Sequence, residues 1–214
     1  MKEQSYTIPA VILTGGQSRR MGRPKAFLPV GGDVLIHRVS RMLEGKFFPL
    51  YVSVKSSFDD VFCGNLPIIH DRSALQTPVA GIASALRTCR EQGLGPWVFI
   101  TCCDLLVSPE ELIDVIIKHA VSYGRPGAAV LQDARGIAPF PGLYHTETVG
   151  YWEEALERGT LRLQKLLHTS GFLHMVPRAE TDARFPDWKL WNINTPEDLS
   201  RYAEHHGYLE MKKL

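Results

Sequence analysis

The chain has 214 residues, 44% of them hydrophobic, and is long enough to bury the core of one α/β domain. A formal net charge of +1 and a pI near 7.7 argue against a nucleic-acid or membrane-surface binder, because those functions normally bring a basic excess. No signal-peptide pattern is present, and no apolar run approaches the ~20 residues of a membrane span. We therefore expect a single domain over residues 1–214, in the cytoplasm, with no nucleic-acid or membrane partner.

The first half of the chain alternates short β-branched runs with amphipathic stretches. The apolar runs predict strands at 9–14, 50–54 and 66–70. Apolar residues at helical spacing predict helices over 35–43 and 78–89, the second with a proline suited to its first turn. Strands that alternate with helices indicate βαβ units and a largely parallel sheet.

The middle of the chain holds the clearest central strand. The run "PWVFITCCD" (96–104) is uncharged until it ends in Asp104. The following "SPEEL" predicts a helix that begins at Ser108 as its cap and ends near Ser122. Strands are expected at 127–133 and 137–145, and the prolines of the second predict an edge or bulged strand.

The last third of the chain is predicted to be mainly helical. Helices are expected at 146–158 and 161–169, followed by a short strand and an irregular loop over 171–194. The closing "TPEDLSRYAEHHG" predicts a capped helix that ends at Gly207.

Glycines and basic residues crowd the loop behind the first strand, "VILTGGQSRRMGRPKAFLPVGG" (11–32). Its spacing matches neither the P-loop nor the G-x-G-x-x-G dinucleotide motif. Gly15 and Gly16 allow the backbone amides to approach a ligand closely, while Arg19 and Lys25 can hold phosphate oxygens. Because open α/β sheets bind ligands at the carboxyl ends of their strands, the loop predicts a phosphate-binding site rather than a solvated basic turn.

The stretch "LTGGQSRRMGRPK" resembles the nucleotidyltransferase signature L-x-G-G-x-S-x-R-M-G-x-x-K, and the chain most resembles the molybdenum cofactor guanylyltransferase family. Four further stretches carry the resemblance across nearly the whole sequence: "HDRSALQTPVAGIASAL", "CCDLLVSP", "PFPGLYH" and "NINTPEDL". The resemblance implies a Rossmann-like three-layer α/β/α fold with a mainly parallel mixed sheet. It also implies transfer of GMP from GTP to molybdenum-carrying molybdopterin, with release of pyrophosphate.

The resemblance also assigns nucleotide-side roles to individual residues. Leu13, Thr14 and Gly15 match the backbone segment around the guanine, and Gly16 favours guanine over cytosine because the related cytidylyltransferases usually have alanine there. Lys25 and the glycine amides would hold the triphosphate. Catalytic roles are expected for Arg19, Lys25 and Asp104.

Two aspartates at strand ends complete the expected nucleotide site. Asp104 would hold Mg²⁺ against the phosphates. Capping of the next helix is the alternative for Asp104, but Ser108 is expected to fill that role. Asp71 follows the strand at 66–70, and the matching aspartate of the family contacts the nucleotide. A turn-forming role is the alternative for Asp71.

The C-terminal motif is expected to serve the acceptor. Asn192 and Asn194 lie two apart in an extended segment and so project to one side, which suits the mixed donors and acceptors of a pterin edge. By resemblance they would lie near the molybdopterin substrate together with Arg19. Transient contacts with molybdoenzymes or cofactor chaperones are also expected.

Three departures from the family pattern leave alternatives open. Lys55 stands near the place of a family asparagine that contacts the nucleotide, and Thr77 and Cys102 replace a usual glycine and proline. A nucleotidyltransferase that uses CTP or another phosphorylated acceptor therefore stays an alternative, as does a non-catalytic carrier of GTP or molybdenum cofactor. The joint presence of Lys25 and Asp104 favours an enzyme.

Overall fold

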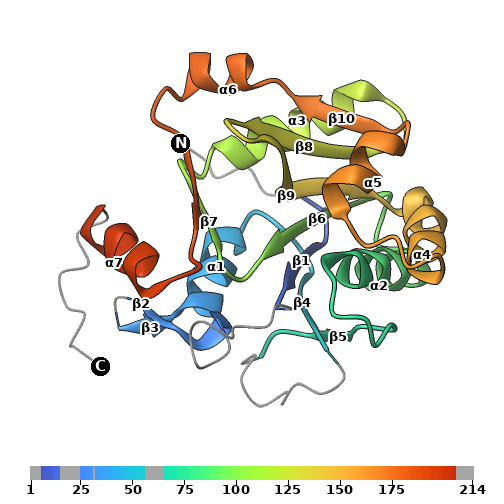
Figure 1. Cartoon of the computed structure of the whole chain (residues 1–214), viewed down its shortest axis with the longest axis horizontal. Helices are drawn as coiled ribbons and strands as arrows, with labels where there is room; N and C mark the ends of the chain where they lie inside the picture. The colour runs from blue at the N-terminus through green and yellow to red at the C-terminus, as the bar shows by residue number, and fades with distance from the viewer. Residues whose placement is uncertain (1–5, 15–24, 31, 56–64, 206–214) are drawn as a thin grey trace.

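We describe the protein from a computed structural model, which defines residues 6–14, 25–30, 32–55 and 65–205. A central sheet has the strand order β10-β8-β9-β6-β1-β4-β5 (Figure 1). Its strands are β1 (Ala10–Leu13), β4 (Leu50–Val54), β5 (Ile68–His70), β6 (Trp97–Cys102), β8 (Ala128–Asp133), β9 (Gly136–His145) and β10 (Leu173–Val176). The strands β6, β1, β4 and β5 pair in parallel, whereas β9 is antiparallel to both β6 and β8. The predicted mainly parallel mixed sheet is confirmed.

Helices cover both faces of this sheet, which gives the expected three layers (Figure 1). One face carries α1 (Leu35–Leu43), α3 (Leu112–Tyr123) and α7 (Pro196–His205). The other carries α2 (Pro78–Glu91), α4 (Val149–Glu157) and α5 (Leu163–Thr169). Short 3₁₀ turns lie at Lys25–Phe27 and Thr146–Thr148, and α6 (Arg178–Arg184) follows β10.

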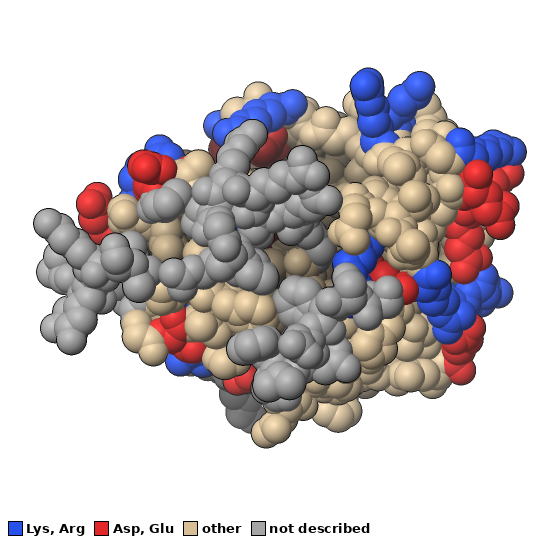
Figure 2. Space-filling model, turned by 60° about the horizontal axis from the view of Figure 1, so that its bottom comes forward, with Lys and Arg blue, Asp and Glu red and all other residues tan. Residues whose placement is uncertain are grey.

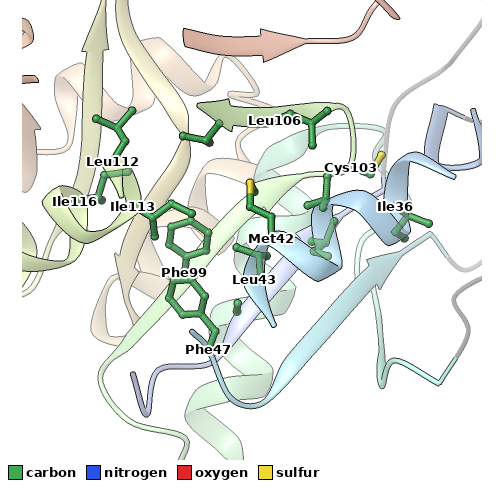
Figure 3. Packing of buried hydrophobic residues seen from close by; sticks show 14 of the residues in the cluster. Ile36, Met42, Leu43, Phe47, Phe99, Cys103, Leu106, Leu112, Ile113 and Ile116 are labelled. Carbon is green, nitrogen blue, oxygen red and sulfur yellow. The ribbon is translucent and has the colours of Figure 1, made fainter. Parts of the chain in front are cut away.

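Strand β1 shows why the sequences of the central strands are nearly continuous apolar runs. Ala10 and Ile12 are buried against the α1 side, while Val11 and Leu13 are buried against the α2 side. A parallel strand covered on both faces meets an apolar layer on each side, so its sequence is a near-continuous apolar run. On the α1 side the rings of Phe47 and Phe99 stack with centroids 4.4 Å apart (Figure 3).

The expectation of an edge position for β9 is wrong, although the bulge is confirmed. β9 lies between β8 and β6, and its register with β8 shifts between Val130 and Leu131. Val130 pairs with Gly142 and Leu131 with Ala138, so the chain from 139 to 141 is the bulge. The two prolines occupy this bulge, where no ladder hydrogen bond is required of them.

Two small antiparallel sheets were not predicted. The strand β7 (Leu105–Ser108) pairs with β11 (Lys189–Asn192), and β2 (Pro29–Val30) pairs with β3 (Asp33–Val34). Ser108 therefore ends a strand, and the prediction that it caps the next helix is wrong because α3 begins only at Leu112.

The C-terminal region differs from its prediction in one element and agrees in another. The short strand after 171 is confirmed as β10, but α6 replaces part of the expected loop. The final helix is confirmed from Pro196 to His205, and its predicted end at Gly207 lies outside the described residues.

Charged side chains are distributed without a dominant sign on the face seen in Figure 2, where basic and acidic groups alternate along the right-hand margin. Many form exposed ion pairs, such as Arg72 with Glu91 and Arg158 with Glu154. Within the described residues, none of the helices combines the length and the apolar character that crossing a bilayer requires.

Candidate functional site

The candidate site lies where the order of the sheet reverses. From β1 the chain continues to β4 and β5 on one side, and only then returns to β6 on the other side of β1. Open α/β sheets bind ligands in the crevice that such a reversal leaves outside the carboxyl ends of the strands. Leu13 ends β1 at this crevice and Thr14 follows it, and the Cys103 amide donates to the Leu13 carbonyl over 3.0 Å. Asp104 follows directly.

Three predicted site residues from distant parts of the sequence meet here. The Lys25 ammonium donates to Asp104 Oδ2 over 2.7 Å and to Asn194 Oδ1 over 2.6 Å. The Lys25 and Asp104 side chains are 18% and 23% exposed, so the pair is partly buried but still accessible to a ligand. One cation thus joins the N-terminal loop, the end of the central strand and the C-terminal motif.

Local structure fixes the Lys25 backbone. The 3₁₀ turn Lys25–Phe27 is closed by the Leu28 amide, which donates to the Lys25 carbonyl over 3.0 Å. Ala26 and Leu28 are buried, at 1% and 5% exposure. Apolar burial on either side of the turn therefore holds the base of the lysine side chain.

The ribbon of β7 and β11 brings the C-terminal motif to Asp104. Beyond the paired residues, the Ile193 amide donates to the Asp104 carbonyl over 2.8 Å. Main-chain bonds therefore set the separation of Asp104 from Asn192 and Asn194, and they do not depend on the carboxylate itself.

The start of α7 is fixed by a capping box. The amides of Asn194 and Thr195 each donate to Asp198 Oδ2 over 3.0 Å, and Thr195 Oγ1 accepts from the Asp198 amide over 3.2 Å. Partial burial alone would raise the pKa of Asp198, but these donors favour the ionised carboxylate and the net pKa is lowered. The cap of α7 thus orients the backbone of Asn194.

A cavity of about 740 Å³ opens beside this cluster. Asp104, Asn192 and Asn194 line it together, as expected for residues projecting to one side of an extended segment. Its walls also carry charged and aromatic side chains that the sequence reasoning missed: Asp133, Arg135, Phe140, Arg178, Trp188, Lys189, Trp191 and Arg201. Arg178 and Arg201 are paired with Asp182 and Asp198, and the other two cations and the flat rings suit an anionic, partly aromatic ligand.

Asp71 lies beyond Thr14, at the end of β5. The Thr14 amide and hydroxyl both donate to the Ser53 carbonyl, over 3.1 and 2.8 Å, which ties the end of β1 to β4. Ser53 Oγ in turn donates to Asp71 Oδ1 over 2.5 Å, and Lys55 pairs with Asp71 Oδ2. The Asp71 carboxylate is 4% exposed and both of its oxygens have partners. Of the other predicted residues, Gly15, Gly16 and Arg19 lie outside the described residues.

Residues 10–174 match the model of the MobA-like NTP transferase domain. The molybdenum cofactor guanylyltransferase of Rhizobium meliloti is 31% identical over 94% of this chain and 93% of its own. A probable molybdenum cofactor guanylyltransferase of Carboxydothermus hydrogenoformans is 33% identical over 92% of this chain and 95% of its own. The chain belongs to the molybdenum cofactor guanylyltransferase family. It is therefore a nucleotidyltransferase.

Solved structures give the same fold. The molybdopterin-guanine dinucleotide biosynthesis protein A of Archaeoglobus fulgidus superimposes with a TM-score of 0.76 at 20% identity, covering 94% of this chain and all of that one. An inositol-1-phosphate CTP transferase of T. maritima reaches 0.62 at 12% identity, over 98% of this chain. At these identities the likeness concerns the fold alone, which is that of nucleotidyltransferases.

The described residues of this guanylyltransferase-family chain fit one mode of cation binding. They contain no group of three His, Cys, Asp or Glu side chains that would cage a metal. Mg²⁺ in nucleotide enzymes needs less, since one or two carboxylates are completed by substrate phosphates and water. The part-exposed Asp104 meets that requirement.

The Cys102 thiol, which also lines the cavity, adds no negative charge to it. Burial raises the pKa of this thiol, and the nearby Asp104 raises the pKa further.

Proposed function

We propose that this family member transfers GMP from GTP to molybdopterin carrying molybdenum. The observation that carries the proposal is the contact of the Lys25 ammonium with both Asp104 and Asn194, two residues that line a large polar cavity. That arrangement places the proposed triphosphate ligands next to the proposed acceptor ligands, as a transfer between two bound phosphates requires.

In the proposed reaction, an acceptor phosphate oxygen forms a bond to the α-phosphorus of GTP while the bond to the β-phosphate oxygen breaks. Pyrophosphate leaves with the electron pair of that bond. The attacking phosphate is already anionic, so no side chain has to remove a proton. Lys25, whose Nζ position Asp104 and Asn194 fix, would stabilise the charge that develops on the phosphates.

The remaining roles follow the family resemblance. Mg²⁺ held by Asp104 would supply charge neutralisation at the triphosphate. Leu13, Thr14 and the amides of Gly15 and Gly16 would surround the guanine and phosphates, with Arg19 on the acceptor side. We further propose transient contacts with molybdoenzymes or cofactor chaperones, and a cytoplasmic location, where GTP is available.

The cavity favours a large acceptor over a small phosphorylated sugar or alcohol. Trp188, Phe140 and Arg135 line it together with Asp104 and provide surface for a fused ring system. A carrier without catalysis is disfavoured, because the family to which the chain belongs consists of transferases.

The test offers radiolabelled GTP and CTP side by side with molybdenum-loaded molybdopterin in the presence of Mg²⁺. We expect label from GTP in the dinucleotide product and little from CTP, and Lys25→Ala should lower the rate by roughly 10²–10³-fold, the scale of one lost electrostatic stabiliser. Equal turnover of CTP would move the protein to the cytidylyl branch. If a sugar phosphate gives product and molybdopterin does not, the proposed acceptor is wrong and the acceptor is a phosphorylated sugar.

A further inference from the structure

A buried lysine on the nucleotide side has no role in the function proposed above. Lys55 directly follows β4, is 8% exposed as a residue, and pairs with Asp71. Its Nζ also donates to the Leu75 carbonyl over 2.9 Å. A buried ammonium is costly unless its partners are well placed, so this position marks a built contact and not a solvated surface lysine.

The partners of Lys55 hold both ends of one loop. Asp71 begins the loop between β5 and α2, and its amide donates to the Val54 carbonyl over 2.8 Å. Leu75 lies near the loop's other end, where its carbonyl also accepts from the Thr77 amide over 3.0 Å. A single ammonium therefore fastens the whole loop to the carboxyl end of β4.

The loop sets the start of α2, which reaches the end of β1. Thr77 caps this helix by accepting from the Val79 amide over 3.3 Å. One turn later Gly81 packs so closely that a Cβ there would lie 2.9 Å from Leu13 Cδ2. A displacement of the loop would consequently be transmitted to Leu13, the first residue of the proposed nucleotide-binding segment.

We propose that Lys55 is a positioning residue for the nucleotide. By neutralising Asp71 and holding the Leu75 carbonyl, it keeps the loop and the first turn of α2 against Leu13 and Thr14. The inference rests on the proposed function, in which these two residues border the nucleotide. It also means that Asp71, with one oxygen bonded to Ser53 and the other to Lys55, acts on the nucleotide through the loop and not by direct contact.

The test measures GTP binding and steady-state turnover for Lys55→Met, Asp71→Asn and the double variant. We expect Lys55→Met to raise the Kd and KM for GTP by about tenfold, in the range of typical coupling between sites. The kcat at saturating GTP and the KM for molybdopterin should stay within about twofold, because the acceptor side is untouched. Lys165→Met, an exposed lysine on α5, serves as the matched control.

The double variant identifies the route of the effect. Because both residues act on one contact, the double variant should bind GTP about as weakly as Lys55→Met alone. It removes both charges of the buried pair, and so it carries the test even where the single variant unfolds. An unchanged Kd for GTP in folded variants would overturn the proposal. So would a double variant whose loss is the product of the two single losses, because Asp71 would then contact the nucleotide itself.

The wild-type protein separates this inference from the proposed function. If the wild type does not bind GTP, the proposed function fails before any variant is compared. If it binds GTP and the variants bind equally well, the inference alone fails.

Discussion

Asp104→Asn separates the chemical role of the carboxylate from its structural role. The substitution keeps the size of the side chain but removes the charge that a hard divalent cation requires. The main-chain bond from the Ile193 amide to the Asp104 carbonyl is unaffected, and Lys25 keeps its contact with Asn194. We therefore expect the site to remain assembled and the reaction to stop.

The structure sets the expected size of each effect. The Lys25–Asp104 pair is mostly buried, at 18% and 23% exposure, but Lys25 keeps Asn194 as a partner, so the loss of the charge should cost about 1–3 kcal/mol of unfolding free energy. That corresponds to a fall in Tm of roughly 2–12 °C for a chain of this size. Turnover should fall at least about 10³-fold, since both the electrostatic stabilisation and the proposed ion are lost.

The assay follows pyrophosphate release from GTP and molybdenum-loaded molybdopterin across a Mg²⁺ titration, with circular dichroism melts of the same samples. Asp114→Asn is the matched control, because this carboxylate lies on α3, accepts a hydrogen bond from the Tyr6 hydroxyl and does not line the cavity. A folded Asp104→Asn protein with wild-type turnover and an unchanged Mg²⁺ dependence would show that the cation is held elsewhere.

Two further predictions concern the C-terminal motif and pH. Asn192→Ala should raise only the KM for molybdopterin, whereas Asn194→Ala should also lower kcat by about tenfold to a hundredfold, the scale of a hydrogen bond to a charged group, because Asn194 bonds Lys25. The measurement is steady-state kinetics in which GTP and molybdopterin are varied in turn. A rise in the KM for GTP alone, in both variants, would contradict the prediction. Burial lowers the pKa of His174, so the folded state favours the neutral ring, and the free energy of unfolding should decrease as the pH falls below about 6.5. Denaturant melts between pH 5 and 8 give the free energy of unfolding at each pH. This free energy should change less steeply with pH for His174→Gln than for the exposed control His168→Gln, and an equal pH dependence in the two variants would refute the assignment.

Much of the fold follows from local sequence patterns. The apolar run over 9–14 predicts β1 because a strand buried on both faces is usually a near-continuous apolar run. The helical spacing from Leu35 to Leu43 predicts α1 with its observed ends. The sequence predicts Asp104 because a charge directly after a buried strand lies at the carboxyl end of that strand, where open α/β sheets bind ligands.

The elements that escaped prediction are short or depend on distant partners. The strand β7 has four residues and pairs with β11, some eighty positions away, so no local alternation reveals it. The helix α6, "RAETDAR", presents no apolar face and is supported by polar contacts such as the Arg178–Asp182 pair. The sequence likewise predicts the same acceptor role for Asn192 and Asn194. Only the folded chain distinguishes Asn194, by its contact with the distant Lys25.

The contact of Lys25 with Asp104 and Asn194 spans 79 and 169 positions of the chain. Contacts of such long range form after the local helices and hairpins, because the entropy of closing a large loop opposes them. During refolding, catalytic activity should consequently return later than helical circular dichroism. A partly folded molecule that already holds most of its secondary structure would have no assembled reaction centre until β11 has joined β7.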